Sequence, residues 1–294
     1  MTDHAILLIG GPDSGKSNFL ARLWLALMSR EGALVAPEAP SDIKYVEDAL
    51  AHLLQGQFAP RSDKNYAESV QSFSVPVVTA KDVEAEPIQI VVPDVSGELW
   101  KTTVETCELP SQWMSNLRAA FGALLFVRIG SDQNIEPLDW VNTAKLLRMP
   151  ALEAEAGQSD TRRIPTQVLL CELLRFLEHS LAADSDTVKP RVAILVTAWD
   201  RLDAQRAEKG PMAYLAKEYP LLAGRLADIS KLNVSVFGVS IVGGDFIDAE
   251  FKQRFFDMDM KEAGYVVQEF DREVQKKPDL TIPIAWVCQG LDNR

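Results

Sequence analysis

Residues 10–17 read GGPDSGKS and follow directly after the apolar run AILLI at residues 5–9. Two glycines, a lysine and a serine at this spacing form a P-loop, whose consecutive backbone N–H groups surround a phosphate. Residues 19–28 are mostly apolar and contain no Gly or Pro, which predicts the helix whose N-terminus adds positive potential to such a loop. The pattern therefore predicts binding of a nucleoside triphosphate, and the alternative is a glycine-rich turn that binds nothing.

The residues of this loop have different expected roles. Lys16 is expected to reach the β- and γ-phosphates and so to take part in catalysis, and the Ser17 hydroxyl is expected to bind Mg²⁺. The other loop residues expected to contact the nucleotide are Gly10, Asp13, Ser14 and Gly15.

The overall composition narrows the function classes. The chain has 294 residues, 47% of them hydrophobic, and a formal net charge of −12. This charge argues against nonspecific binding to nucleic acid or to anionic membranes, since both favour basic patches. The three cysteines form no CxxC pair, the three histidines have no metal-ligand spacing, and no segment has the roughly 20 apolar residues of a membrane span. We therefore expect a cytoplasmic protein with free thiols.

Short β-branched runs recur along the chain and alternate with helical patterns. This alternation is typical of βαβ units and predicts an α/β fold, a three-layer αβα sandwich with a mostly parallel sheet. Pro76 indicates an edge or bulged position in its strand, and residues 282–291 are expected to close the fold as a helix packed on the sheet. The strands are expected at residues 5–9, 72–78, 88–92, 122–129, 192–196 and 234–239.

Two long connections interrupt the alternation. Residues 55–69 have mixed charges and no periodicity, which predicts an exposed loop. Residues 133–190 exceed what a crossover needs, and because nucleotide-binding motifs lie on both sides, we expect one domain over 1–294 with an insertion at 133–190. The insertion carries an apolar helical stripe, for which the core is a more common place than an interface; its members are Val168, Leu169, Leu173, Phe176, Leu177 and Leu181.

Three further positions at predicted strand ends are candidates for the site. Asp94, in the sequence DVSG at 94–97, is expected to hold Mg²⁺, and the N–H of Gly97 to sense the γ-phosphate. Asp200, in TAWD at 197–200, can accept hydrogen bonds from guanine N1–H and N2–H₂, a donor pair that adenine lacks. The alternative for Asp200 is a helix N-cap. Ser240 ends the last strand, where a backbone N–H could meet the guanine carbonyl; the alternative is an ordinary residue at a strand end.

These motifs in this order resemble those of the TRAFAC-class P-loop GTPases over essentially the whole chain. GGPDSGKS, together with DVSGE at 94–98 and the long insertion, is most similar to the bacterial double-GTPase group, whose members are thought to serve in multi-component conflict or defence systems. The resemblance implies GTP and GDP as ligands, Mg²⁺ as cofactor, and Thr197, Asp200 and Ser240 as residues of the base site.

The sequence departs from that pattern at three places. Glu98 stands where Ras-like GTPases have the Gln that orients water, so it acts as a base or only pairs with Lys101, and intrinsic hydrolysis is expected to be slow. Ala198 replaces the usual Lys, whose aliphatic stem would cover the base; Trp199 either stacks there or, as is more common, packs in the core. In the first polar loop, Ser62 is the best candidate for the Mg²⁺-binding hydroxyl, with Ser69 behind it.

Asp13 has a further candidate role. An Asn at this place binds an activating K⁺ in some related GTPases, and an Asp could do the same, although its charge would lie near the phosphates.

Three functions fit the sequence. The first is a GTPase switch in which loops 55–70 and 94–101 change with the nucleotide and a protein partner contacts them or the insertion at 133–190. The second is an ATPase or small-molecule kinase, which Ala198 favours. The third is a scaffold that binds nucleotide without hydrolysing it, which Glu98 would allow.

Overall fold

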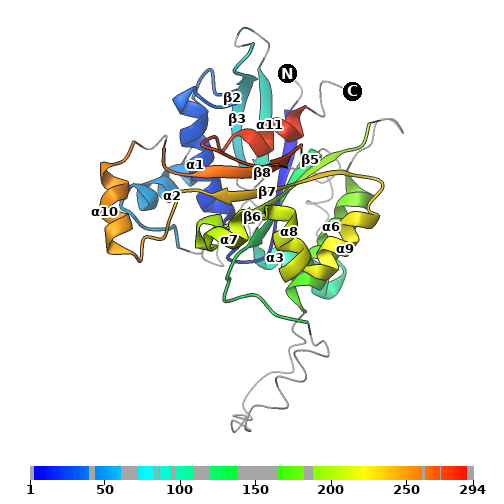
Figure 1. Cartoon of the computed structure of the whole chain (residues 1–294). Helices are drawn as coiled ribbons and strands as arrows, with labels where there is room; N and C mark the ends of the chain where they lie inside the picture. The colour runs from blue at the N-terminus through cyan, green and yellow to red at the C-terminus, as the bar shows by residue number, and fades with distance from the viewer. Residues whose placement is uncertain are drawn as a thin grey trace, which may run out of the picture.

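The computed structural model describes residues 3–39, 44–60, 72–82, 84, 87–93, 97–108, 120–137, 164–181, 188–259, 262–271 and 273–289. These residues form one nine-stranded mixed sheet with helices on both faces (Figure 1). In spatial order the strands are β2 (Leu34–Val35), β3 (Ser72–Thr79), β4 (Ile88–Pro93), β1 (Asp3–Ile9), β5 (Ala120–Arg128), β6 (Arg191–Thr197), β7 (Asn233–Ser240), β8 (Tyr265–Phe270) and β9 (Glu273–Lys277).

The helices follow in chain order. They are α1 (Lys16–Ser29), α2 (Lys44–Leu54), α3 (Gly97–Thr106), α6 (Thr166–Ser180), the 3₁₀-helix η2 (Trp199–Arg201), α7 (Ala204–Ala207), α8 (Pro211–Glu218), α9 (Pro220–Asp228), α10 (Ala249–Asp257) and α11 (Ile282–Cys288).

The centre of the sheet is parallel. β4, β1, β5, β6 and β7 run in one direction, so their carboxyl ends meet at one edge of the sheet, where ligands of open α/β folds bind. Every strand predicted from the sequence is present, with ends that differ by one or two residues. These strands are continuous apolar runs because helices bury them on both faces.

Two separate cores lie on the two faces of the sheet. Ile6 and Leu8 of β1 belong to the core that includes α1, α2, α10 and α11, whereas Leu7 and Ile9 belong to the core that includes α3, α6, α8 and α9. Successive side chains of a strand point to opposite faces, so β1 supplies both cores. The predicted three-layer αβα sandwich is confirmed.

Helix α6 is the described helix of the long connection between β5 and β6. Leu169, Leu173, Leu177 and Leu181 are buried against the sheet, so the prediction of a core role for this stripe is confirmed. Val168 was wrongly placed on the stripe: it is 38% exposed, because it lies one residue, about 100° of helix rotation, away from Leu169. The insertion at 133–190 lies partly outside the described residues, so its extent stays a prediction.

The ends of the sheet hold elements that the sequence analysis did not predict. These are β2, α2 and α10, and the antiparallel strands β8 and β9 that extend the sheet beyond β7 (Figure 1). β2 pairs with only Val78 and Thr79 of β3, so among the described strands Pro76 faces no partner on that side, as its predicted edge position requires. Helix α11 closes the fold as predicted, with Ile284 and Val287 buried in the core. None of the described helices combines the length and the apolar character needed to cross a membrane.

Candidate nucleotide-binding site

The P-loop connects β1 to α1 at the edge of the sheet where the parallel strands end. Gly15 has a φ of +93°, which is the left-handed region that favours glycine. A Cβ on Gly10 would lie 2.9 Å from Ser14 Oγ and 3.0 Å from Phe126 Cβ, so the loop closes tightly at this point. In the part of the chain that the structure describes, the backbone N–H groups of Asp13, Ser14 and Gly15 donate to no protein acceptor. They are therefore available to an anion.

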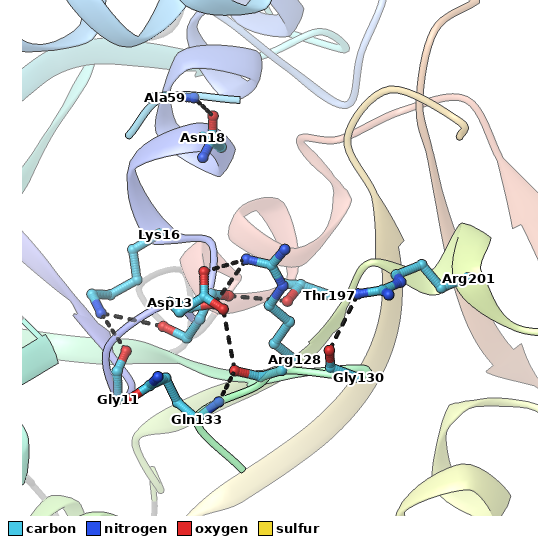
Figure 2. A network of polar contacts seen from close by, with 12 residues as sticks. Gly11, Asp13, Lys16, Asn18, Ala59, Arg128, Gly130, Gln133, Thr197 and Arg201 are labelled. Carbon is cyan, nitrogen blue, oxygen red and sulfur yellow. Dashed lines mark hydrogen bonds and ion pairs between the residues drawn. The ribbon is translucent and has the colours of Figure 1, made fainter. Parts of the chain in front are cut away.

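Lys16 lies across the same loop (Figure 2). Its Nζ donates to the carbonyl oxygens of Gly10 at 2.9 Å and Gly11 at 3.1 Å, and to Ser14 Oγ at 3.2 Å. Ser14 is buried, and its carbonyl oxygen accepts a hydrogen bond of 3.0 Å from Thr197 Oγ1. Thr197 thus ties the end of β6 to the phosphate loop, which joins two of the predicted site residues.

Asp13 is held by an arginine that the sequence analysis did not single out. Nη1 of Arg128 donates to Asp13 Oδ1 at 2.6 Å and to the Asp13 carbonyl at 3.0 Å, and Ser131 Oγ lies 3.2 Å from Oδ2 (Figure 2). Asp13 has a φ of 60°, a conformation that Asp tolerates better than most residues. Its carboxylate already has a cation, so the predicted K⁺ site would place a second positive charge beside a guanidinium.

Gly97 touches the P-loop. A Cβ at this position would lie 2.3 Å from Pro12 N and 2.4 Å from the Gly11 carbonyl carbon, which leaves no space for any side chain. The predicted proximity of Gly97 to the phosphate loop therefore agrees with the structure. Asp94, Ser62 and Ser69 lie outside the described residues, as does the side chain of Glu98.

Lys101, the alternative partner considered for Glu98, is 3.7 Å from Glu105 Oε1 one helical turn away.

Asp200 is fixed from the end of the neighbouring strand. Ser240 Oγ donates to Asp200 Oδ1 at 2.5 Å and accepts from the Gly243 N–H at 2.9 Å, and Ser240 is fully buried. Burial raises the pKa of Asp200, while the hydrogen bond from Ser240 acts in the opposite direction. Tyr265 pairs with Ser240 in the β7–β8 ladder, and burial, followed by the negative charge of Asp200, raises the pKa of Tyr265 to about 12.

Trp199 is a core residue. It is 2% exposed, and a Cβ on Gly238 would lie 2.5 Å from its ring, so the indole packs against β7 and cannot stack on a ligand. Of the two roles considered for Trp199, the core role is confirmed.

A cavity of about 530 Å³ joins the P-loop to Asp200. This volume is in the range of small-molecule sites. Gly15, Thr197 and Asp200 all line it, so the structure brings one residue of the phosphate loop and two of the base motif to a single space. The charged side chains in its lining are Arg128, Asp132, Asp200, Arg201, Asp245 and Lys252, and the larger apolar ones are Phe58, Ile241, Val242, Phe246 and Ile247.

Comparison with protein families shows which family the chain belongs to. The family described as Double-GTPase 1 matches residues 7–287. The chain belongs to the Double-GTPase 1 family. It is therefore a P-loop GTPase of the double-GTPase group and a GTP-binding protein. None of the curated protein sequences matches it.

Solved structures share only distant similarity with this Double-GTPase 1 chain. The signal recognition particle receptor SRb-GTP/SRX complex from Chaetomium thermophilum matches with 14% identity and a TM-score of 0.37, over 87% of this chain and 98% of that chain. The Ski7 GTPase-like domain of S. cerevisiae matches in two structures. The one bound to GDP and inorganic phosphate has 14% identity and a TM-score of 0.40, over 94% of this chain and 58% of that chain. The one bound to GTP has 13% identity and a TM-score of 0.37, over 93% and 58%.

Two arginines with structural roles were not predicted from the sequence: Arg128, which lines the cavity, and Arg22, which lies outside it. Arg128 lies within the predicted strand at 122–129, and a charged residue at the carboxyl end of a parallel strand is itself a signal of a site. Arg22 interrupts the apolar run of α1, and it is buried, with Nε 2.7 Å from the Ile241 carbonyl oxygen and Nη2 donating to that of Ala263. Burial lowers the pKa of Arg22 to about 10. A lone charge inside an apolar helix face was the available signal for it.

Proposed function

We propose that this protein hydrolyses GTP to GDP and phosphate with Mg²⁺, and that the two nucleotide states act as a switch in a multi-protein bacterial system, including a role in defence. The observation that supports this best is the shared cavity. The phosphate loop contributes Gly15 to its wall and the base motif contributes Thr197 and Asp200, so one nucleotide could contact both.

Asp200 would select the base. An ionised carboxylate accepts from guanine N1–H and N2–H₂, whereas adenine offers an acceptor at N1. Ser240 fixes the Asp200 side chain by donating to Oδ1, and the remaining lone pairs of the carboxylate would accept from the base. Ile241 and Val242 line the cavity, whereas Ser240 is buried. Ser240 would therefore act on the base indirectly, by positioning Asp200, and the backbone that follows Ser240 would supply the N–H for the guanine carbonyl.

The phosphates would bind at the P-loop. The unpaired N–H groups of Asp13, Ser14 and Gly15 and the positive N-terminus of α1 suit an anion, and Lys16 would reach the β- and γ-phosphates. Ser17 stands at the start of α1, where its hydroxyl, with the oxygens of Asp94 and Ser62, would form the hard oxygen donor set that Mg²⁺ prefers. Held by these residues, the ion would supply positive charge against the negative charge that develops during phosphoryl transfer.

Hydrolysis is expected to be slow without a partner. Gly97 lies against Gly11 and Pro12, where its N–H could donate to a γ-phosphate, and a carboxylate at Glu98 cannot donate to the transferring group as a glutamine amide can. A partner protein that contacts the loops at 55–70 and 94–101, or the insertion at 133–190, would then control the rate.

Two contacts in the described part of the first loop support an effect of the nucleotide on it. The Ala59 N–H donates to Asn18 Oδ1 on α1 at 2.9 Å (Figure 2), and the neighbouring residues Gln57 and Phe58 line the cavity. A bound nucleoside would therefore touch the segment that leads into this loop. Neither nucleic acid nor a membrane is expected as a direct partner, and the expected location is the cytoplasm.

Calorimetric titration of GTP, GDP and ATP with Mg²⁺, together with a phosphate-release assay, tests the proposal. We expect GTP and GDP to bind at least tenfold more tightly than ATP, and GTP to be hydrolysed. Lys16→Ala should abolish triphosphate binding, while Lys217→Ala, an exposed lysine on α8, serves as the control. Equal or tighter binding of ATP would favour an ATPase or kinase. Firm GTP binding without phosphate release would favour a scaffold.

A further inference from the structure

The cavity lacks a long side chain at position 198. Ala198 lines it with only a methyl group, and its φ of 58° starts the turn that takes Trp199 into the core. The loop after β6 therefore leaves one side of the space beside Asp200 without cover from its own residues 198 and 199. A flat base bound to Asp200 gains affinity only if other side chains cover its faces.

Arg128, at the end of the adjacent strand β5, lies beside the uncovered side of the cavity. Arg128 and Thr197 are partners in the parallel β5–β6 ladder, so the side chain leaves the sheet next to the turn at Ala198. It lines the same cavity and is 29% exposed. Nη1 is anchored on the P-loop by the Asp13 carbonyl and carboxylate (Figure 2). The guanidinium thus spans from the sheet to the phosphate loop along the wall of the cavity.

The ion pair with Asp13 limits what this arginine can do. At 2.6 Å the carboxylate neutralises the guanidinium, so the pair has no net charge to offer a phosphate. The planar guanidinium and its aliphatic stem remain, and an arginine plane stacks well on aromatic rings. A second arginine, Arg201, also lines the cavity, with Nη1 3.2 Å from the Gly130 carbonyl oxygen, but it is not attached to the P-loop.

We infer that Arg128, positioned by Asp13, packs its guanidinium plane on the purine base and supplies the cover that residue 198 does not. The inference rests on the proposed function, because it concerns the same nucleotide site. Stacking is insensitive to the identity of the base, so Arg128 contributes affinity, whereas Asp200 contributes the preference for guanine.

The test separates stacking on the base from contact with phosphate. Removing Arg128 alone would leave the Asp13 carboxylate unpaired near the phosphates, so Arg128→Ala is combined with Asp13→Asn, which keeps the net charge of the pair at zero, as in the parent protein. Dissociation constants for GMP, GDP and GTP are measured by calorimetry for the parent protein, for this charge-neutral Arg128→Ala variant, and for Arg128→Lys with Asp13 intact. We expect Arg128→Ala to weaken all three nucleotides by about the same factor, roughly tenfold. Arg128→Lys keeps the charge without the plane and should lose most of that affinity.

Two controls keep the outcome clear. Arg206→Ala removes another arginine paired with an aspartate, Asp203, at the exposed helix α7. It should leave the dissociation constants of all three nucleotides unchanged. Arg201→Ala removes the competing arginine of the cavity, and it should weaken binding less than Arg128→Ala. Melting temperatures show whether each variant is folded. If Arg128→Ala is not folded, Arg128→Lys alone tests the inference.

The result can overturn the inference without touching the proposed function. A loss below twofold, a loss that grows from GMP to GTP, or a larger loss in Arg201→Ala would each exclude stacking by Arg128 while GTP still binds. Conversely, tight ATP binding by the parent protein with an equal loss in Arg128→Ala across AMP, ADP and ATP would overturn guanine selection and support the stacking role. A parent protein that binds no nucleotide overturns both.

Discussion

Replacing Asp200 by Asn gives the sharpest test of guanine recognition. The new amide can keep the Ser240 hydrogen bond through its oxygen, because that oxygen takes the place of Asp200 Oδ1, which lies 2.5 Å from Ser240 Oγ. Its NH₂ group would then face the N2–H₂ group of guanine, donor against donor. One charge-assisted hydrogen bond is lost, at about 1.5–3 kcal/mol, and two donors stay unpaired, at about 1–3 kcal/mol more.

The sum predicts that Asp200→Asn weakens GTP about 10²- to 10⁴-fold. Xanthine has a carbonyl at C2 that accepts from the new amide, so XTP should bind the variant more tightly than it binds the parent protein. Calorimetry with GTP, XTP and ATP measures all three effects, and the phosphate contacts are common to the three ligands. A GTP affinity within threefold of the parent value, or no gain for XTP, would refute the assignment of Asp200 to the base.

Four other changes have defined outcomes. A protonated Asp200 cannot accept both guanine donors, so GTP affinity should fall as the pH is lowered through the raised pKa of Asp200. Ser240→Ala removes a hydrogen bond that lowers the pKa of Asp200, so titrations against pH should show the loss of GTP affinity beginning at higher pH in this variant. Gly97→Ala forces a Cβ to within 2.3 Å of Pro12 N, so we expect slower GTP hydrolysis and a melting temperature lower by several degrees, whereas Gly224→Ala, with open space around it, should show neither change. Arg22→Met removes the donor from the buried Ala263 carbonyl and the partly buried Ile241 carbonyl, and should reduce the free energy of unfolding by about 2–4 kcal/mol in urea titrations. Arg30→Met, at the exposed end of the same helix, should cost under about 1 kcal/mol. Turnover should be equal in K⁺ and Na⁺ buffers because an arginine already occupies Asp13, and faster turnover in K⁺ would contradict this.

The parts of the fold that were predictable are those that local patterns encode. β1, β5, β6 and β7 are continuous apolar runs, and the P-loop has an order of residues that few other structures require. The additions at the sheet ends lack such patterns. β9 reads Glu-Val-Gln-Lys-Lys with one partly buried residue, and α10 has only Phe251 and Phe255 buried, so their sequences resemble polar loops. Their structure depends on neighbours distant in sequence.

The residues of the candidate site also fall into two groups, those that a local motif encodes and those that only the fold brings together. Lys16, Gly97 and Asp200 were found because each belongs to a short motif at a strand end, and the structure places Gly97 and Asp200 beside the loop and the cavity as expected. Arg128 was not found, because its partner Asp13 lies 115 residues earlier in the chain and no motif links them. Only the parallel pairing of β1 with β5 brings the two together.

The ion pair also explains how this acidic chain tolerates an aspartate inside its phosphate loop. At a net charge of −12, the protein repels a triphosphate at long range, so attraction has to be local. A free carboxylate at residue 13 would oppose the loop amides and Lys16 at the point where we propose that the phosphates bind. Arg128 neutralises that carboxylate with a contact of 2.6 Å, and it does so from a strand end that also borders the cavity beside Asp200. Asp13 and Arg128 therefore have to be interpreted as one unit, and changing either alone would disturb both the phosphate and the base ends of the site.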